Sequence, residues 1–316
     1  MTDADGAPAR TAAERAGDAL AGCRVGDALG ESFFFGEREV AVARVAGRRL
    51  PPTPRRGYFA WTDDTLQSAS VHAVLVAHAG SLPQDALAAH LADRLEPGRG
   101  YGGNARQLLL AVREGASWRQ EAASSFGGAG SYGNGAAMRV APVGAWHAGD
   151  PDRAAELARA QSEVTHAHHE AADGAAAVAA VTSVLAAAPV GAAPSARELL
   201  DLAADHAGEG RVRSGLVRAG GLLDAPLVQV VDQLGTGWEV AAYDTVPFAL
   251  WAAVQAPHRF AATFWRTVAG LGDRDTTYAI ACAVVAAHVG RAAIPASWDA
   301  LVEPLPSWVD DPALDG

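Results

Sequence analysis

Alanine-rich segments divided by glycine and proline most constrain what this 316-residue chain can fold into. Alanine has the highest intrinsic helix propensity, and here apolar residues recur around it at helical spacing. Alternation of β-branched and polar residues is almost absent, and its best candidate for a strand is residues 39–45. The pattern predicts an all-α fold, with helices over residues 11–29, 64–78, 83–95, 104–114, 151–165, 169–188, 196–206, 213–223, 227–234, 240–255, 259–268 and 276–289.

The chain is expected to form one domain. Half of its residues are apolar, which is enough for a sizeable core, and neither a long linker nor a repeat of 20 to 50 residues divides it. We place the domain at residues 11–296, after an N-terminal tail at residues 1–10. Residues 297–316 carry five acids and no base, and we expect this acidic tail to wrap the surface or fray.

Charge and cysteine content narrow the class of protein. The 36 acidic and 25 basic residues give a net charge of −11, and every base is arginine. This balance argues against a nucleic-acid footprint, which requires a basic face. Cys23 and Cys282 lie far apart without metal-ligand spacing, as in proteins of a reducing compartment. We expect a cytoplasmic protein.

One uncharged stretch, residues 174–196, is long enough to span a bilayer. It consists mostly of alanine, which contributes little to insertion, and it is interrupted by Thr182, Ser183 and Pro189. We therefore expect a buried helix that stops at Pro189, and no membrane partner.

Two acidic clusters, about 210 residues apart, each precede an apolar helical segment. Residues 61–65 read Trp-Thr-Asp-Asp-Thr, and residues 272–277 read Gly-Asp-Arg-Asp-Thr-Thr. Helix capping accounts for one or two acids at each helix, but it does not require two matching clusters. If both helix starts meet in space, their four carboxylates would repel one another unless cations bind, and Asp and Thr oxygens suit Mg²⁺ or Mn²⁺ rather than zinc. Capping and metal binding both remain open at this point.

Glycine-rich and histidine-rich motifs add to this pattern. Residues 22–30 contain three glycines that permit close backbone approach, and residues 133–139 form a turn whose N–H groups could cradle a phosphate. Structural turns are the alternative for each motif. Residues 165–169 read Thr-His-Ala-His-His, which is a poor tetrahedral zinc set without distant partners. Capping and nucleotide contact are the favoured interpretation of that segment.

Taken in order, these motifs resemble the ADP-ribosylglycohydrolase family, whose members include the dinitrogenase reductase-activating glycohydrolases. The resemblance covers residues 16–290, and it implies a single-domain orthogonal helical bundle with two divalent cations, Mg²⁺ or Mn²⁺. Each motif is weak alone, but the ordered set is specific. The motifs are Gly-Asp-Ala-Leu-Gly at 26–30, Thr-Asp-Asp-Thr at 62–65, Arg-Gly-Tyr-Gly at 99–102, Gly-Asn-Gly-Ala-Ala-Met-Arg at 133–139, Thr-His-Ala-His at 165–168 and Gly-Asp-Arg-Asp-Thr at 272–276.

The resemblance also assigns roles to residues of this chain. It implies hydrolysis of an N- or O-glycosidic bond to ADP-ribose, on a protein side chain or a small molecule, with Asp63 or Asp64 taking a proton from the attacking water. The loop at 133–135 would lie near the pyrophosphate. The residues that match metal ligands are Thr62, Asp63, Asp64, Asp273, Asp275 and Thr276. Substrate contacts are assigned to Phe34, Tyr101, Gly133, Asn134, Gly135, Met138, Thr165, His166, His168 and Tyr243.

The chain departs from the family pattern in ways that leave the leaving group open. Phe34 stands where many relatives carry a glutamate, Glu31 and Glu37 lie nearby and could substitute, and Phe34 could stack on a leaving-group ring. Leu271 replaces a glycine, and Arg274 replaces a small residue. A second hypothesis is therefore a glycosidase of a small nucleotide-like metabolite. A third is a non-catalytic ADP-ribose-binding or structural protein on the same fold.

Overall fold

The computed structural model describes residues 10–34, 38–54 and 57–309, and these residues form helices joined by loops, without a β-strand. The all-α expectation is confirmed. In chain order the helices are α1 Ala12–Glu31, α2 Arg38–Ala46, α3 Asp63–Ala77, α4 Gln84–Asp93, α5 Gly103–Arg113, α6 Trp118–Ser124, η1 Ser125–Gly128, α7 Gly135–Met138, α8 Ala141–Trp146, α9 Pro151–Glu163, α10 His169–Ala187, α11 Ala196–His206, α12 Arg211–Gly220, α13 Leu227–Leu234, α14 Ala242–Val254, α15 Phe260–Val268, α16 Thr276–Val289, η2 Arg291–Ala293, α17 Ala296–Asp299 and η3 Ser307–Val309.

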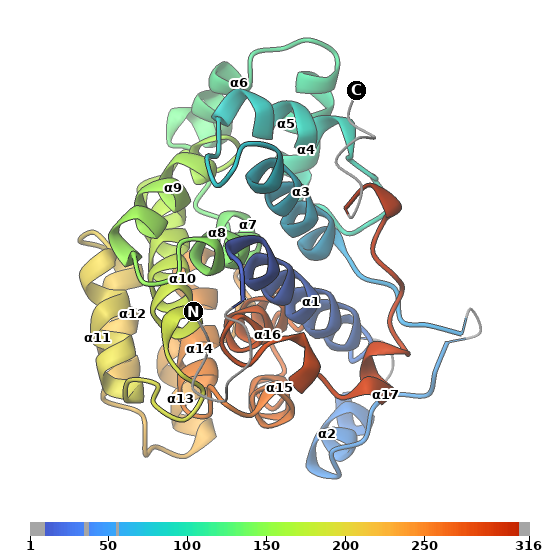
Figure 1. Cartoon of the computed structure of the whole chain (residues 1–316), viewed down its shortest axis with the longest axis vertical. Helices are drawn as coiled ribbons and strands as arrows, with labels where there is room; N and C mark the ends of the chain where they lie inside the picture. The colour runs from blue at the N-terminus through green and yellow to red at the C-terminus, as the bar shows by residue number, and fades with distance from the viewer. Residues whose placement is uncertain (1–9, 35–37, 55–56, 310–316) are drawn as a thin grey trace.

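The centre of the molecule is the packing of α1 on α16, the first long helix on the last (Figure 1). Gly22, Gly26 and Gly30 lie four residues apart on α1 and face α16. A Cβ atom at Gly26 would stand 2.4 Å from the carbonyl oxygen of Tyr278, so only glycine permits this backbone approach. Close packing here matters for function because it sets the start of α16 beside α1.

Replacing Gly26 with alanine is expected to destabilise the protein by about 1–3 kcal/mol, because the added methyl group must push two buried backbones apart. Chemical denaturation of the purified variant measures this. The matched control is Gly103→Ala at the start of α5, where a Cβ atom would meet nothing within 4 Å. Equal stability of the two variants would contradict the packing described.

The uncharged stretch at residues 174–196 begins inside α10 and continues beyond its end at Ala187. Among the described helices, α10 alone has the length and composition to cross a membrane, and 83% of that window is buried inside the protein. It packs against α8, α9, α11 and α16. This burial fits the core helix that we expected, and the helix ends two residues before Pro189.

Local helix signals are confirmed at several ends. Ser195 and Glu198 form the capping box of α11, and the Asp150 side chain caps α9. The strand candidate at residues 39–45 is wrong, because that segment lies within helix α2. Its valines alternate, but the described residues offer no neighbouring strand to pair with, and Val40 and Val42 stay exposed.

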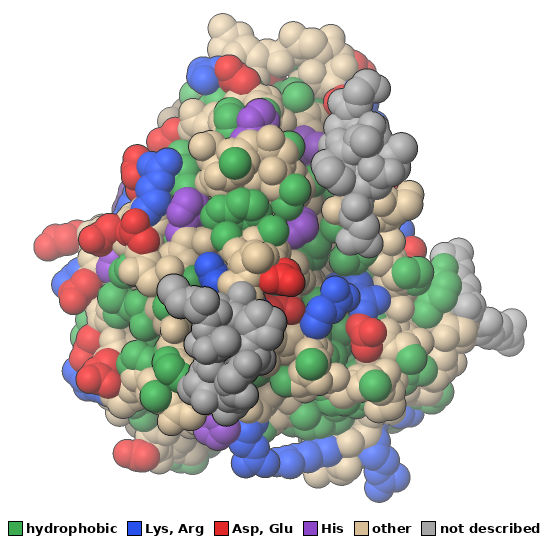
Figure 2. Space-filling model, in the orientation of Figure 1, with side chains coloured by type: hydrophobic (Ala, Val, Ile, Leu, Met, Phe, Trp, Pro, Cys, Tyr) green, Lys and Arg blue, Asp and Glu red, His purple; other side chains and the backbone are tan. Residues whose placement is uncertain are grey.

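As far as residue 309, the acidic tail is ordered and packs on the domain, which is the first of the two alternatives we expected. Residues 296–309 form α17 and η3, and Phe59 pairs with Val302 in an isolated parallel β-bridge. In Figure 1 this C-terminal segment, drawn in red, runs from α17 up the right side of the molecule toward α3. On the face shown in Figure 2, acidic and basic side chains are scattered in small groups among uncharged and apolar ones.

Candidate active site

The two acidic clusters meet at the starts of α3 and α16. Thr62 is the N-cap of α3, and its Oγ1 accepts a hydrogen bond from the backbone N–H of Asp64. The hydroxyls of Thr62 and Thr276 both donate to Asp64 Oδ2, at 3.2 and 3.5 Å. Asp275 is the N-cap of α16. The same residues therefore cap the two helices and bring the two clusters face to face.

A third helix contributes a carboxylate that sequence analysis did not single out. Asp27 on α1 is fully buried, and its Oδ2 accepts hydrogen bonds from the backbone N–H groups of Thr62 and Thr65, at 2.9 and 3.1 Å. It also accepts from the Thr65 hydroxyl at 2.5 Å. These bonds fix the first turn of α3 on α1. The sequence signal for this carboxylate was Asp27 in the Gly-Asp-Ala-Leu-Gly motif at residues 26–30, where our prediction considered only the glycines.

Burial and mutual repulsion raise the pKa values of the carboxyl groups in this cluster. Burial is the largest cause, and the charge of Asp275 is the next. Together they raise the pKa of Asp63 to about 8 and hold the pKa values of Asp64 and Asp273 well above their usual range. Carboxyl groups that affect one another in this way form one electrostatic unit.

Two carboxyl groups on α1 belong to the same unit. Burial, followed by the charge of Asp275, raises the pKa of Asp27 to about 7 and that of Glu31 to about 8. Asp27 and Glu31 lie one helical turn apart, so α1 presents both toward the start of α16. From the sequence, Glu31 was named as a residue near Phe34 that could substitute for the missing glutamate.

The oxygen donors in this cluster fit a divalent cation. Asp64 Oδ1 and Asp27 Oδ1 are buried and accept no hydrogen bond. In the part of the chain that the structure describes, no three His, Cys, Asp or Glu side chains are placed to hold a metal ion by themselves. The hydroxyls of Thr62 and Thr276, which contact Asp64, would be further oxygen donors. Carboxylate and hydroxyl oxygens are what Mg²⁺ and Mn²⁺ prefer. A cation among them would also offset the repulsion that raises the carboxyl pKa values.

The raised pKa values predict how the stability of the metal-free protein depends on pH. The pKa of Asp63 is about 8 in the folded state against 3.8 for the unperturbed group, so the folded state keeps protons that the unfolded state releases. The contribution of protonated Asp63 to the stability of the folded state is fully present below about pH 4 and is lost as pH rises through about 8. Denaturation in chelator should show lower stability at pH 8.5 than at pH 7, with a smaller loss in Asp63→Asn. A metal-free wild type whose stability rises over that range would contradict the electrostatics described.

Asp63 is held by a buried polar network. The Nε2 of Gln67 donates to Asp63 Oδ2 at 2.7 Å, and Arg139, which is 0% exposed, donates to Gln67 Oε1 at 2.7 Å. Arg139 also donates to the side chain and backbone oxygens of Gln161. Tyr101 is buried near Asp63, and burial followed by that negative charge raises the pKa of its hydroxyl. The network fixes the direction of the Asp63 carboxylate.

The glycine loop at residues 133–135 lies directly against the second acidic cluster. The Nδ2 of Asn134 donates to Asp273 Oδ2 at 2.8 Å and to Thr245 Oγ1 at 3.0 Å. A Cβ atom at Gly135 would stand 2.7 Å from the His166 ring, so the loop rests on that ring. The structure therefore brings the predicted loop, the predicted histidine and Asp273 together.

The other predicted residues in and around this loop are Gly133, Met138, Thr165 and His166. The Thr165 hydroxyl is 2.7 Å from His166 Nδ1, and burial followed by the charge of Arg139 lowers the pKa of His166 to about 3. The ring is therefore neutral at physiological pH. The backbone N–H of Gly133 donates to a neighbouring serine hydroxyl, and Met138 packs in the hydrophobic core.

An exposed aromatic surface borders the loop. The ring of Tyr132 lies 5.9 Å from Phe126, 5.7 Å from His168 and 5.9 Å from Tyr243. Phe126 is 57% exposed, and the Arg211 guanidinium stacks on Tyr243 at 3.3 Å. Sequence analysis named His168 and Tyr243 but missed Phe126 and Tyr132, although Tyr132 immediately precedes the glycine loop. Exposed rings of this kind can stack on a flat ligand.

A large cleft opens beside the acidic cluster. Its volume is about 1140 Å³, and Thr62, Asp275 and Glu31 are among its lining residues. Prolines and aromatic rings form much of its wall, with charged groups at its edge. The other lining residues are Ala28, Ser32, Val40, Arg44, Pro51, Pro52, Pro54, Tyr58, Phe59, Ala60, Trp61, Leu95, Glu96, Pro97, Gly98, Arg99, Gly100 and Glu303.

Phe34 does not line this cleft. Its ring lies 4.6 Å from the guanidinium carbon of Arg274, which also donates to the backbone oxygen of Phe33. Of the two acids that could substitute for the missing glutamate, Glu31 lines the cleft, whereas Glu37 lies outside the described residues.

The fold and the cluster define an all-α protein with a buried acidic site that contacts a glycine loop and borders a cleft. The chain belongs to the ADP-ribosylglycohydrolase family, whose model matches residues 8–314, and it is a hydrolase of the glycosidase type. It is 28% identical to ADP-ribosylhydrolase ARH3 of Mus musculus, covering 88% of this chain and 85% of that one. It is 27% identical to the Homo sapiens protein of that name, covering 88% and 86%.

A solved structure has the same fold. An ADP-ribosylglycohydrolase-related protein complex superimposes with a TM-score of 0.64 at 24% identity, covering 96% of this chain and 95% of the other. The predicted fold of the family is therefore confirmed, and the hydrolysis carried out by the chain is of the ADP-ribosylglycohydrolase type.

Proposed function

We propose that this protein hydrolyses the glycosidic bond between ADP-ribose and a leaving group with the help of two divalent cations, Mg²⁺ or Mn²⁺, bound between α3 and α16. The proposed ligands are Thr62, Asp63, Asp64, Asp273, Asp275 and Thr276. We also propose a cytoplasmic location, which is supported by the two free, buried cysteines, Cys23 and Cys282.

The observation that carries the proposal is the environment of Asp64. Its carboxylate is 1% exposed, faces the acids of the opposite helix start and leaves Oδ1 without a hydrogen bond. A buried, unpaired carboxylate oxygen among like charges is costly for stability. Cation binding explains why the chain keeps this cluster.

The residues around the cluster have distinct tasks in this proposal. When bound, the cations supply a Lewis acid and a template for the ribose hydroxyls. Asp63, whose Oδ2 is held by Gln67, accepts the proton of the attacking water. Asn134 orients Asp273, and Asp27 fixes the start of α3, so both acidic clusters keep their positions during turnover.

The surroundings of the cluster offer an aromatic surface for an ADP-ribosyl group and a cleft for a leaving group. The exposed rings of Tyr132 and Phe126 offer a stacking surface to a nucleotide. They lie beside the glycine loop, whose Gly133 and Asn134 N–H groups already donate to Ser131 Oγ and to the carbonyl oxygen of Val240. The cleft beyond Glu31 and Asp275 has room for a leaving group. The printed name of the ARH3 relatives, ADP-ribosylhydrolase, supports the same substrate class.

A turnover assay tests this function. The chelated protein is offered arginine-linked, serine-linked and free small ADP-ribosyl conjugates, with and without added Mg²⁺ or Mn²⁺, and the products are identified. We expect release of ADP-ribose that stops with chelator and returns with metal. Activity that persists in chelator would contradict the metal dependence. Turnover of small nucleotide-like conjugates alone would favour the second hypothesis, and ligand binding without any product would favour the third.

A further inference from the structure

We propose that Arg99 is a positioning residue for the metal ligands on α3, and that the C-terminal segment, residues 299–304, holds Arg99 in place through Glu303. This inference rests on the proposed function, since it concerns the residues that would hold the cations. It extends the site to residues that we placed, from the sequence, in an acidic tail outside the domain.

Arg99 contacts the first acidic cluster from both its backbone and its side chain. The backbone N–H of Asp63 donates to the carbonyl oxygen of Arg99 at 2.8 Å. The Nη1 of Arg99 donates to the carbonyl oxygen of Trp61 at 3.2 Å, and its guanidinium stacks on the Trp61 ring at 3.6 Å. Arg99 therefore fixes the two residues on either side of Thr62, which is the N-cap of α3.

Glu303 holds the guanidinium of Arg99 in a two-pronged contact. Its Oε2 accepts from Nη1 at 2.7 Å, and its Oε1 accepts from Nη2 at 3.0 Å. Glu96 occupies the third edge, accepting from Nε at 2.8 Å. The Arg99 and Glu303 side chains are only 19% and 17% exposed, so solvent screens this pair less than a surface pair. Bidentate contacts of this kind give a fixed geometry as well as energy.

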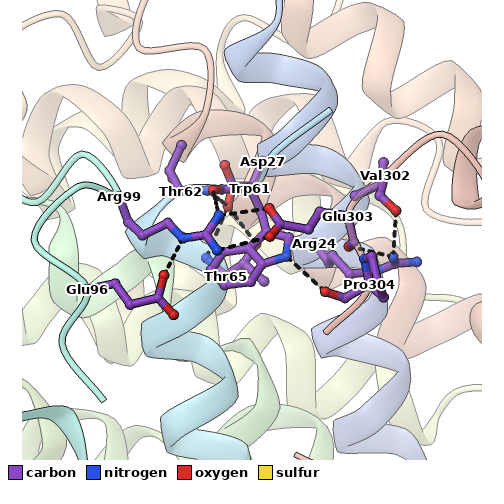
Figure 3. A network of polar contacts seen from close by, with 10 residues as sticks. All are labelled: Arg24, Asp27, Trp61, Thr62, Thr65, Glu96, Arg99, Val302, Glu303 and Pro304. Carbon is purple, nitrogen blue, oxygen red and sulfur yellow. Dashed lines mark hydrogen bonds and ion pairs between the residues drawn. The ribbon is translucent and has the colours of Figure 1, made fainter. Parts of the chain in front are cut away.

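The backbone of the C-terminal segment fastens Glu303 to the chain that leads into α3. Phe59 donates its N–H to Leu301 and accepts from the N–H of Glu303, at 2.7 and 3.0 Å. The indole N–H of Trp61 donates to the carbonyl oxygen of Pro304 at 3.2 Å. Figure 3 shows Arg99 between Glu96 and Glu303, with Trp61, Thr62 and Asp27 behind it. Two segments about 240 residues apart thus form one support for the start of α3.

The consequence is that loosening Arg99 should weaken metal binding before it unfolds the protein. Asp63 and Thr62 take their backbone positions from Arg99 on one side and Asp27 on the other. Residues that orient metal ligands without touching the metal typically change metal affinity about 10–100-fold when replaced. We expect Glu303→Gln to lie near the lower end of that range, because Glu96 still contacts Arg99.

The C-terminal segment supplies a matched control. Asp299 forms an ion pair with Arg24 on α1, which ties the same segment to the domain without touching Arg99 or the acidic cluster. Asp299→Asn therefore loosens the segment alone, whereas Glu303→Gln also releases Arg99. A third variant, Arg99→Lys, keeps the positive charge but loses the fork that binds both Glu303 oxygens and Trp61.

The test is isothermal titration of Mn²⁺ into each full-length, metal-free protein, together with thermal unfolding in chelator. We expect about 10-fold weaker Mn²⁺ binding for Glu303→Gln, a loss at least as large for Arg99→Lys, and an affinity near wild type for Asp299→Asn, while Glu303→Gln and Asp299→Asn melt at similar temperatures. Equal affinities of Glu303→Gln and wild type would overturn the inference, as would equal losses in Glu303→Gln and Asp299→Asn. A wild type that binds no Mn²⁺ would instead overturn the proposed function.

Discussion

Replacing Asp64 with asparagine is expected to reduce turnover by about 10³-fold or more while leaving the metal-free protein at least as stable as the wild type. The loss follows from the several kcal/mol that a bound cation contributes to catalysis, because each 1.36 kcal/mol corresponds to a tenfold change in rate. The retained stability follows from the environment of Asp64, where burial and neighbouring carboxylates disfavour the charge that the variant removes.

The Asp64→Asn experiment is informative because it should lower turnover without lowering the stability of the metal-free protein. Turnover is measured at saturating Mn²⁺ on whichever ADP-ribosyl conjugate the wild type hydrolyses, and unfolding is measured in chelator. Asp201→Asn on α11 is the control, since its carboxylate is exposed and pairs with Arg197 on the same helix. A large loss of stability in metal-free Asp64→Asn would show that the carboxylate serves the fold. Wild-type turnover in this variant would remove Asp64 from the metal site.

Replacing Arg139 with methionine is expected to destabilise the protein by about 3 kcal/mol or more. Arg139 is completely buried, and its guanidinium donates to the side chains of Gln67 and Gln161 and to a backbone oxygen. Methionine fills much of the volume but leaves these buried oxygens without donors, at a cost of about 1–3 kcal/mol for each group. The variant also frees Gln67, which holds Asp63.

Urea denaturation of metal-free Arg139→Met measures this cost, with Arg153→Met as the control. Arg153 forms an exposed i,i+3 pair with Glu156 on α9, so its replacement should change stability by about 0.5 kcal/mol at most. A stability of Arg139→Met within that same margin would contradict the network. If the folded variant also binds Mn²⁺ more weakly, the network serves the site as well as the core.

The long helices could be predicted from the sequence because their signals are local. Alanine content, Gly/Pro breaks and caps such as Ser195–Glu198 located α10, α11 and α16 to within a few residues. The short helices α6, α7 and α8 were not predicted, because they are too short to show a helical period and α8 contains Pro142 and Gly144. Helix α2 was predicted as the best strand candidate because alternating Val and Ala satisfy both periods, and tertiary context decides between them.

The acidic clusters could be found in the sequence, but their meeting could not be derived from spacing. It depends on the close approach of α1 and α16 at Gly22, Gly26 and Gly30, which only the fold shows. Asp27 was overlooked because its role is to accept three hydrogen bonds from α3 rather than to stand in an acidic run. The Arg99–Glu303 contact joins residues 204 positions apart, and no local pattern signals it.

The central claim is that the starts of α3 and α16 together hold two divalent cations. Anomalous diffraction from crystals grown with Mn²⁺ tests it most directly, because it locates the metal without reference to activity. The account predicts two anomalous peaks between the two helix starts, in contact with carboxylates from both acidic clusters. Crystals grown at a Mn²⁺ concentration that supports full turnover, with no anomalous peak between α3 and α16, would contradict it.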